Sequence, residues 1–186
     1  MEISARMVKD LRDLSGAGMM DAKKALLACD GVMEEAVDWL RTKGLAKAAK
    51  KADRVASDGL IGVHASNEGV VAVEINSETD FVAKNDEFQE MVRDISIVAM
   101  NADSVESLLS KSIGEKAIKD VITDKIRVIG ENLTVRRMVK FEGKNVAHYI
   151  HNSVGKGLGK LAVLVAYDGE NGDMARQIAM HIAASN

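Results

Sequence analysis

The sequence predicts an α+β fold: an N-terminal module of three helices, a basic linker, and a core of two related α+β subdomains with antiparallel sheets. Apolar residues recur at helical spacing through residues 4–43, which predicts the helical module. From Leu60 onward the spacing changes to the two-residue alternation that is typical of strands. Strands and helices then follow one another without the regularity of βαβ units, and this favours antiparallel sheets.

The first predicted domain covers residues 1–44. Three apolar stripes mark its helices: Met7, Val8, Leu11 and Leu14; Ala22, Ala25 and Leu26; and Met33, Ala36, Val37 and Leu40. Ser4 is expected to cap the first helix. Gly16 and Gly18 break the chain after that helix, because glycine adopts the backbone conformations of a tight turn. Gly44 is expected to end the third helix. Three helices in so short a segment resemble a ubiquitin-associated (UBA-like) module.

Residues 45–58 form the predicted linker, which is basic. Between residues 41 and 54, six basic side chains accompany one acidic residue, Asp53: Arg41, Lys43, Lys47, Lys50, Lys51 and Arg54. The last four lie at helical spacing and would line one face of a connecting helix. A solvated face is the favoured interpretation, and a contact with RNA or with an acidic partner is the alternative. No aromatic residue stands among the charges, so base stacking is not supported.

The first core subdomain is predicted at residues 59–140. Leu60–Ser66 and Gly69–Asn76 are expected to pair as a hairpin. A helix should then run from Asp86, with Phe88 on its apolar stripe, and a second helical segment should end at Gly130.

The second core subdomain is predicted at residues 141–186. Asn132–Glu142 and Asn145–Asn152 are expected to form another hairpin that turns at Gly143, and Leu161–Tyr167 to form a third strand. Met174, Ile178 and Ile182 are expected to form the apolar stripe of the final helix.

An internal comparison draws attention to the segment Asn76–Asn85, which connects a strand to a helix. Met91-Val-Arg-Asp-Ile95 resembles Met174-Ala-Arg-Gln-Ile178, and each follows a strand. Ala72 and Met91 are 19 positions apart, whereas Ala162 and Met174 are 12 apart, so the first copy carries seven more residues. If the two segments are copies of one repeat, the fold does not need these extra residues, and such loops tend to carry function. The comparison therefore favours a Phe81 ring presented to a partner over a ring folded into the core.

Composition limits the class of protein. Hydrophobic residues make up 47% of the 186 residues and aromatic residues 3%, so the core is predicted to be aliphatic. The net charge of −3 argues against a nucleic-acid binder. The one cysteine, Cys29, excludes an intrachain disulfide and is expected to be a packing residue in a reducing compartment. No apolar run reaches the roughly 18 residues of a membrane span. A cytoplasmic protein without a membrane partner is predicted.

Two motifs that could indicate ligand sites do not fit them. Gly155-Lys-Gly-Leu-Gly-Lys160 lacks the P-loop spacing and precedes a strand, so no direct nucleotide binding is expected. His148 and His151 would point to opposite faces of a strand and have no cysteine or carboxylate at ligand spacing, so no metal site is expected. No grouping of nucleophile and base is present, so no catalytic residue and no cofactor are predicted.

Three motifs together resemble the elongation factor Ts family: Ser15–Leu26, where the family usually begins with threonine; Thr79-Asp-Phe-Val-Ala-Lys-Asn85; and Ala-Met-His-Ile-Ala-Ala at 179–184. The resemblance covers essentially the whole chain. It implies a translation elongation factor that binds the GTPase elongation factor Tu and releases GDP so that GTP can bind. It implies no chemistry of the protein's own.

The resemblance also implies partner-binding residues. The loop Thr79, Asp80, Phe81 and Val82 would enter the GTPase near its Mg²⁺ site. Arg12, Met19, Met20 and Lys23 of the N-terminal module would grip the other side of the nucleotide site, although the residues alone favour core packing for the two methionines. His151 is a weaker interface candidate.

Longer members of the family continue beyond Asn186 with a helical hairpin, which takes part in dimerisation, so a monomer that pairs one-to-one with the GTPase is expected. A UBA-like adaptor that binds ubiquitin or a peptide is the alternative function, and an RNA-binding protein is a third.

Overall fold

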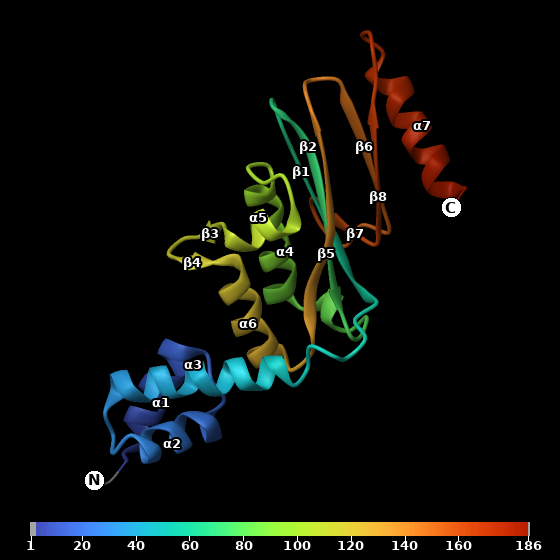
Figure 1. Ribbon diagram of the computed structural model, residues 1–186. Coiled ribbons are helices and arrows are strands. Elements are labelled where there is room, and N and C mark those ends of the chain that lie inside the picture. Colours follow the sequence, from blue (N-terminus) through green and yellow to red (C-terminus); the bar gives the residue numbers. More distant parts are fainter. Residues whose placement is uncertain (1–2, 186) are drawn as a thin grey trace. The chain divides into compact units, whose positions relative to one another are not determined.

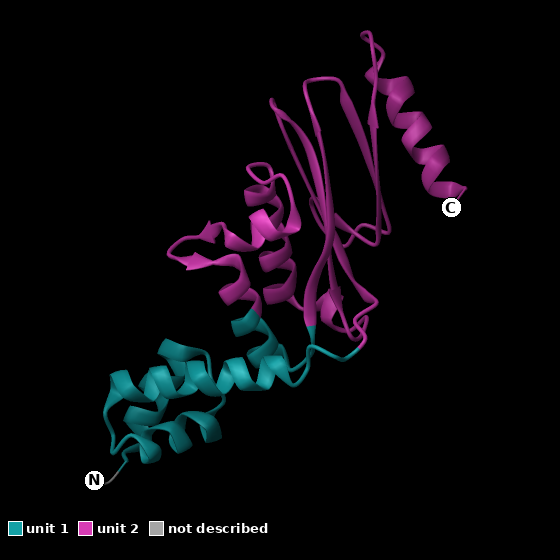
Figure 2. Ribbon diagram, viewed as in Figure 1, with its two compact units in different colours: residues 1–54, 123–132 teal, residues 55–122, 133–186 magenta. Residues whose placement is uncertain are grey.

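The computed structural model describes residues 3–185. Asn186, the last residue of the predicted second core subdomain, lies outside the described residues. The chain divides into two compact units, which Figure 2 shows in different colours. Unit 1 holds the residues up to Arg54 together with Thr123–Asn132. Unit 2 holds Val55–Ile122 and the residues from Leu133 onward. The domain boundaries predicted at residues 44, 58 and 140 stay a prediction.

Unit 1 begins with three helices, α1 (Ala5–Ser15), α2 (Met19–Ala28) and α3 (Met33–Ala49), which fit the predicted UBA-like module (Figure 1). Their apolar sides share one core of buried residues: Val8, Leu11, Ala17, Ala22, Ala25, Leu26, Ala36 and Leu40. Ser4 caps α1 as predicted, because its hydroxyl accepts a hydrogen bond from the Met7 backbone N–H. Cys29 packs against the core, as expected for a packing residue.

Two predictions for this module are wrong. Leu14 was predicted on the packed stripe of α1, but its side chain is 69% exposed, because it lies at the edge of a stripe whose buried residues are Val8 and Leu11. Gly44 was predicted to end α3, but the helix continues to Ala49. A Cβ atom at Gly44 would lie 2.9 Å from Cδ of Arg127, so this glycine permits a close approach of another side chain.

Unit 2 is built around two antiparallel sheets. β1 (Asp58–Ser66) and β2 (Gly69–Ser77) form the predicted hairpin, and they join β5 (Leu133–Glu142) and the short β7 (Leu158–Gly159) in the order β5-β2-β1-β7. β6 (Val146–His151) and β8 (Leu161–Ala166) make the second sheet. The two sheets pack face to face through a cluster of apolar side chains: Val63, Val70, Ala72, Val146, Ile150, Ala162 and Leu164.

Helices cover both outer faces of this pair of sheets (Figure 1). α4 (Asp86–Ala99) lies against β1 and β2 and buries Phe88 completely, as its predicted stripe requires. It is followed by α5 (Val105–Ser110), the short strands β3 (Ser112–Ile113) and β4 (Lys116–Ala117), and α6 (Ile118–Ile129). α7 (Gly172–Ala184) lies against β6 and β8 on the opposite side.

The predicted hairpin of Asn132–Glu142 with Asn145–Asn152 is wrong. β5 pairs with β2, and β6 pairs with β8, so these neighbouring strands belong to different sheets. β2 is buried along almost its whole length, as expected of a central strand with a neighbour on each side. Because β1 provides only one neighbour, β5 provides the other.

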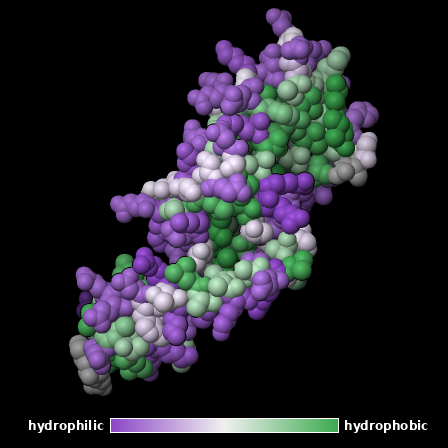
Figure 3. All heavy atoms as spheres, in the orientation of Figure 1, coloured by the Kyte–Doolittle hydropathy of each residue, from purple (hydrophilic) through white to green (hydrophobic). Residues whose placement is uncertain are grey.

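The predicted stripe of α7 is not its packed face. Met174, Ile178 and Ile182 are between 46% and 56% exposed, and the buried residues are three alanines: Ala175, Ala179 and Ala183. Small side chains let the helix lie close to the β6–β8 sheet. Figure 3 shows apolar side chains gathered over β6, β8 and α7 on the face that it draws.

Candidate functional site

The segment between β2 and α4 is a turn that presents one aromatic ring to solvent. Residues Val82–Lys84 form a 3-10 helix, η1. The backbone N–H groups of Ala83, Lys84 and Asn85 donate to the carbonyls three residues earlier, at 3.0–3.2 Å. Phe81 is 75% exposed, whereas Val82 is 6% and Ala83 is 2% exposed. The ring therefore projects from a turn whose next two side chains are packed. It is not part of the core, and its contact with a partner stays a prediction.

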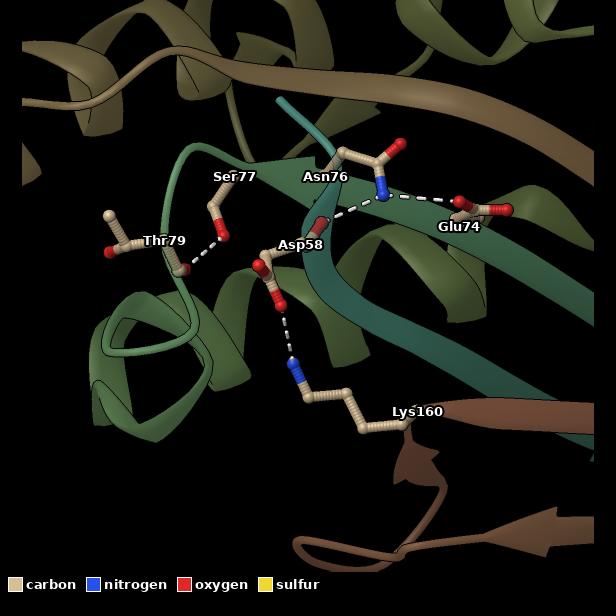
Figure 4. Close-up of polar contacts among 6 residues, drawn as sticks. All are labelled: Asp58, Glu74, Asn76, Ser77, Thr79 and Lys160. Carbon is tan, nitrogen blue, oxygen red and sulfur yellow. Dashed lines mark hydrogen bonds and ion pairs between the residues drawn. The ribbon is translucent and has the colours of Figure 1, made fainter. Parts of the chain in front are cut away.

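Side chains hold this turn from within the protein. The buried hydroxyl of Ser77 donates to the carbonyl of Thr79 at 2.9 Å (Figure 4). The amide of Gln89 donates to the carbonyl of Ala83 at 3.0 Å. The side chain of Asn85 caps α4 by accepting from the Phe88 N–H at 3.0 Å. Each bond fixes one end of the turn to an adjoining element, so the backbone around Phe81 is preorganised.

The strands that lead into the turn are fixed by a second polar group. The buried Asn76 donates from Nδ2 to the Asp58 carbonyl at 2.8 Å and to Oε1 of Glu74 at 3.1 Å (Figure 4). The Asp58 carboxylate pairs with Lys160, with 3.3 Å between Nζ and Oδ1. Glu74 also pairs with Arg137 at 2.6 Å. These contacts tie the end of β2 to the start of β1.

Lys84 is a feature of the turn that sequence reasoning did not assign to the site. Its ammonium lies 5.8 Å from the centroid of the Phe81 ring, within the range of a cation–π interaction. The sequence signal was the three-residue spacing, because side chains at i and i+3 lie above one another in a 3-10 helix. Asp80, which sequence reasoning did assign to the site, is exposed and directly precedes Phe81 in the chain.

The N-terminal candidates lie in unit 1, around the turn between α1 and α2. Arg12 is exposed in the last turn of α1. Met19 and Met20 begin α2 and are 50% and 67% exposed, so the packing role that the residues alone favoured is wrong. Lys23 is exposed one turn further along α2. Helical spacing places Met20, Lys23 and the 56% exposed Leu27 along one face of α2.

His151 is exposed at the end of β6 in unit 2. Its Nδ1 atom lies 3.3 Å from the hydroxyl of Tyr149. Nothing in these contacts distinguishes it as a partner residue. The other histidine of the strand, His148, is half-buried, and burial followed by the charge of Arg176 lowers its pKa.

The structure thus brings the candidates together in two groups, Thr79–Val82 in unit 2 and Arg12, Met19, Met20 and Lys23 in unit 1. Within residues 3–185, no group of three or more His, Cys, Asp or Glu residues could hold a metal ion. Among the helices of the same residues, none is long and apolar enough to cross a membrane.

Comparisons with known proteins agree on one family. A family model described as "Elongation factor TS" matches residues 78–186, which is more than half of the chain. The elongation factor Ts of Jannaschia sp. (strain CCS1) is 58% identical over 186 residues, and those of Ruegeria pomeroyi and Dinoroseobacter shibae are 57% and 56% identical. Each comparison covers 100% of this chain and 64% of the relative, so the chain spans less than two thirds of their length.

Proposed function

The chain belongs to the elongation factor Ts family, and from this we propose that it is a translation elongation factor that binds elongation factor Tu and promotes release of GDP so that GTP can bind. It acts by contact between proteins in the cytoplasm, without a catalytic residue or a cofactor of its own. One observation carries the proposal: Phe81 is 75% exposed on a turn that is held by the buried Ser77 hydroxyl and by the packed side chains of Val82 and Ala83.

The energetic requirement is a difference in binding. An exchange factor need only bind the nucleotide-free GTPase more tightly than the nucleotide-bound form, and reciprocity makes this equivalent to weakening the nucleotide. A thousandfold change in nucleotide affinity requires about 4 kcal/mol. Burying a phenylalanine ring contributes about 1.5–3 kcal/mol. Phe81 therefore supplies about half of the requirement, and a second contact must supply the rest.

The ring acts at the metal ion of the GTPase. GTPases hold their nucleotide through contacts to the phosphates and through Mg²⁺, which bridges phosphate oxygens and protein groups. In this proposal Phe81 enters the GTPase near that ion, and the neighbouring carboxylate of Asp80 disturbs the groups that hold it. Thr79 and Val82 flank this pair in the chain and are part of the same proposed contact loop. The contacts of Thr79 with Ser77 and the burial of Val82 keep the turn ordered before binding, so little entropy is lost on association.

The N-terminal module provides the second contact. Met19 and Met20 are exposed on a surface rather than packed in the core, and Arg12 and Lys23 place positive charge beside them. Unbranched thioethers suit a contact surface because they adapt to irregular partners. His151 remains a weaker candidate for an additional contact.

The test is the rate at which elongation factor Tu releases a fluorescent GDP analogue, with and without this chain. We expect the chain to accelerate release in a concentration-dependent and saturable way. An unchanged rate at saturating chain would refute the proposal. A pull-down against nucleotide-free elongation factor Tu and against ubiquitin separates it from the UBA-like adaptor, which would retain ubiquitin alone.

A further inference from the structure

Arg127 lies within unit 1 although it belongs to α6, far along the chain from the three N-terminal helices. Its side chain is only 11% exposed. One guanidinium nitrogen, Nη2, donates a hydrogen bond to the backbone carbonyl of Ser15, the last residue of α1. The stem of Arg127 fills the space above Gly44, where a Cβ atom would lie 2.9 Å from its Cδ. Arg127 is therefore packed against both α1 and α3.

The contact with Ser15 fixes the point at which the chain leaves α1. The carbonyls of the last helical turn lack helical partners and carry partial negative charge, so a cation there is favourable. Beyond Ser15 the chain turns at Gly16, which has a left-handed φ of 64° and donates to the Arg12 carbonyl. The Ser15 hydroxyl also accepts from the Ala17 N–H at 3.3 Å. The direction of the chain toward Met19 follows from this geometry.

The other end of the turn is held by an ion pair. Asp21, in the first turn of α2, pairs with Lys47 of α3 at 2.8 Å. The hydrogen bond from Lys47 is the main cause of the lowered pKa of Asp21, to which the charge of Arg127 also contributes. The segment 16–20 is thus held by Arg127 at Ser15 and by Lys47 at Asp21. Ala17 is buried between these contacts, and Met19 and Met20 project outward.

Arg127 does more here than fill space. Its Nη1 atom is buried and, in the part of the chain that the structure describes, has no hydrogen-bond partner. A buried donor without an acceptor is unfavourable, and an apolar side chain of similar length would avoid that penalty. Its Nη2 atom also pairs with Asp124 at 3.9 Å, but that carboxylate does not belong to the α1–α2 turn. The directional bond to Ser15 is the contact of Arg127 that defines the backbone of the turn.

We propose that Arg127 is a positioning residue that holds Met19 and Met20 in the orientation in which the N-terminal module binds the GTPase. This inference rests on the proposed function. It assigns to α6 a role in partner binding through the α1–α2 turn, without any contact between Arg127 and the partner.

The experiment compares Arg127→Met with Arg6→Met, a matched change on α1 at a side chain that is 90% exposed. Carbon-13 methyl spectra of methionine, recorded on the free protein, should show shifted Met19 and Met20 signals in Arg127→Met and unshifted signals in Arg6→Met. Affinity for nucleotide-free elongation factor Tu should fall about tenfold in Arg127→Met, or about 1.4 kcal/mol. The rate of GDP release at saturating chain should fall as well, by no more than about tenfold, because the weakened N-terminal contact supplies part of the differential binding while the Phe81 turn is intact.

A double-mutant cycle with Met20→Ala shows whether Arg127 acts through the methionine. We expect the two losses of affinity to be less than additive, since either change removes the same contact. Full additivity, or methionine signals that match those of Arg6→Met, would overturn the inference. If Arg127→Met does not fold, Arg127→Lys, which keeps the charge but loses the planar fork, serves in the same cycle. If the unmodified chain fails to bind the GTPase, the proposed function fails, and the methionine spectra still decide the positioning role.

Discussion

Replacing Phe81 by alanine, with Phe88→Ala as its pair, separates the role of the turn from that of the core. The two rings lie seven positions apart on either side of η1, but Phe81 is 75% exposed and Phe88 is 0% exposed. Truncation of an exposed ring changes stability by about 0.5 kcal/mol or less. Truncation of a fully buried one costs about 3–5 kcal/mol. For a chain of this size these values correspond to a change of about 2 °C or less and to a fall of about 6–20 °C in melting temperature.

Exchange activity should respond in the opposite way to stability, with the larger effect in Phe81→Ala. Phe81→Ala removes the ring that the partner would bury. The rate of GDP release, at a fixed concentration of the chain below saturation, should therefore fall about tenfold or more. That factor corresponds to about 1.4 kcal/mol of lost differential binding, which is within the range of a buried aromatic anchor. Phe88→Ala should lose activity only in proportion to the unfolded fraction, and activity should return when the assay temperature is lowered.

Thermal melts and stopped-flow release of the fluorescent GDP analogue, performed on the same samples, test both expectations. A melting temperature of Phe81→Ala that falls as far as that of Phe88→Ala would show that the ring supports the fold. A Phe81→Ala variant that is both stable and fully active would show that the exposed ring has no role in exchange, and would contradict the proposed mechanism.

Three further predictions concern the basic linker, His148 and the oligomeric state. Lys50→Glu should leave the free energy of unfolding within about 0.5 kcal/mol of the unmodified chain and should barely change the rate of GDP release. Lys47→Glu should lower the free energy of unfolding by up to about 1 kcal/mol, because it breaks the exposed pair with Asp21. Chemical denaturation measures the stability of both variants. Burial and the charge of Arg176 lower the pKa of His148 from its usual 6.5, so the folded state favours the neutral ring. Stability is therefore lost as the pH falls below about 6.5. The drop in melting temperature between about pH 7.5 and 5.5 should be smaller in His148→Gln than in the unmodified chain. Light scattering should give a mass near the 20.0 kDa of a monomer at every concentration, and a constant mass of roughly twice that value would contradict it.

Local patterns were sufficient to predict much of the fold. The α1–α2 break follows from Gly16 and Gly18, the β1–β2 hairpin from strict alternation, and the packed face of α4 from the position of Phe88. Each depends on residues that are close in sequence. The exposure of Phe81 agrees with the preference drawn from comparing two strand–helix connections in the same chain, whereas the repeat itself stays a prediction.

The wrong pairing that was predicted for β5 concerns contacts that are distant in sequence. The pairing of β5 with β2 is decided by competition among strands for a central neighbour, which no local pattern records. The local glycine signal did not predict that α3 continues through Gly44, and the close approach of Arg127 to that glycine is visible only in the folded chain. The outward face of α7 shows that a stripe of large apolar residues does not always mark the packed side when a parallel stripe of alanines permits closer packing.

The two candidate contact regions share one structural device. Among the described residues four polar side chains are buried, and two of them, Asn76 and Ser77, stand directly before the Phe81 turn. Most buried polar groups are hydrogen-bonded, and a hydrogen bond has a direction, so it defines a backbone path more narrowly than apolar packing does. Ser77 does this through the carbonyl of Thr79. In unit 1, Arg127 does it through the carbonyl of Ser15.

In both regions, therefore, exposed apolar side chains project from turns whose carbonyls are held by side chains from other elements or from the adjoining strand. A turn that is already ordered loses little conformational entropy when a partner binds, so more of the free energy of burying Phe81 or Met20 is available for binding. An exchange factor works through a difference in affinity between two states of its partner. The free energy that is not lost to ordering the turns can therefore favour the nucleotide-free over the nucleotide-bound GTPase. The rigidity of the two turns is thus as much a part of the proposed mechanism as the exposed side chains themselves.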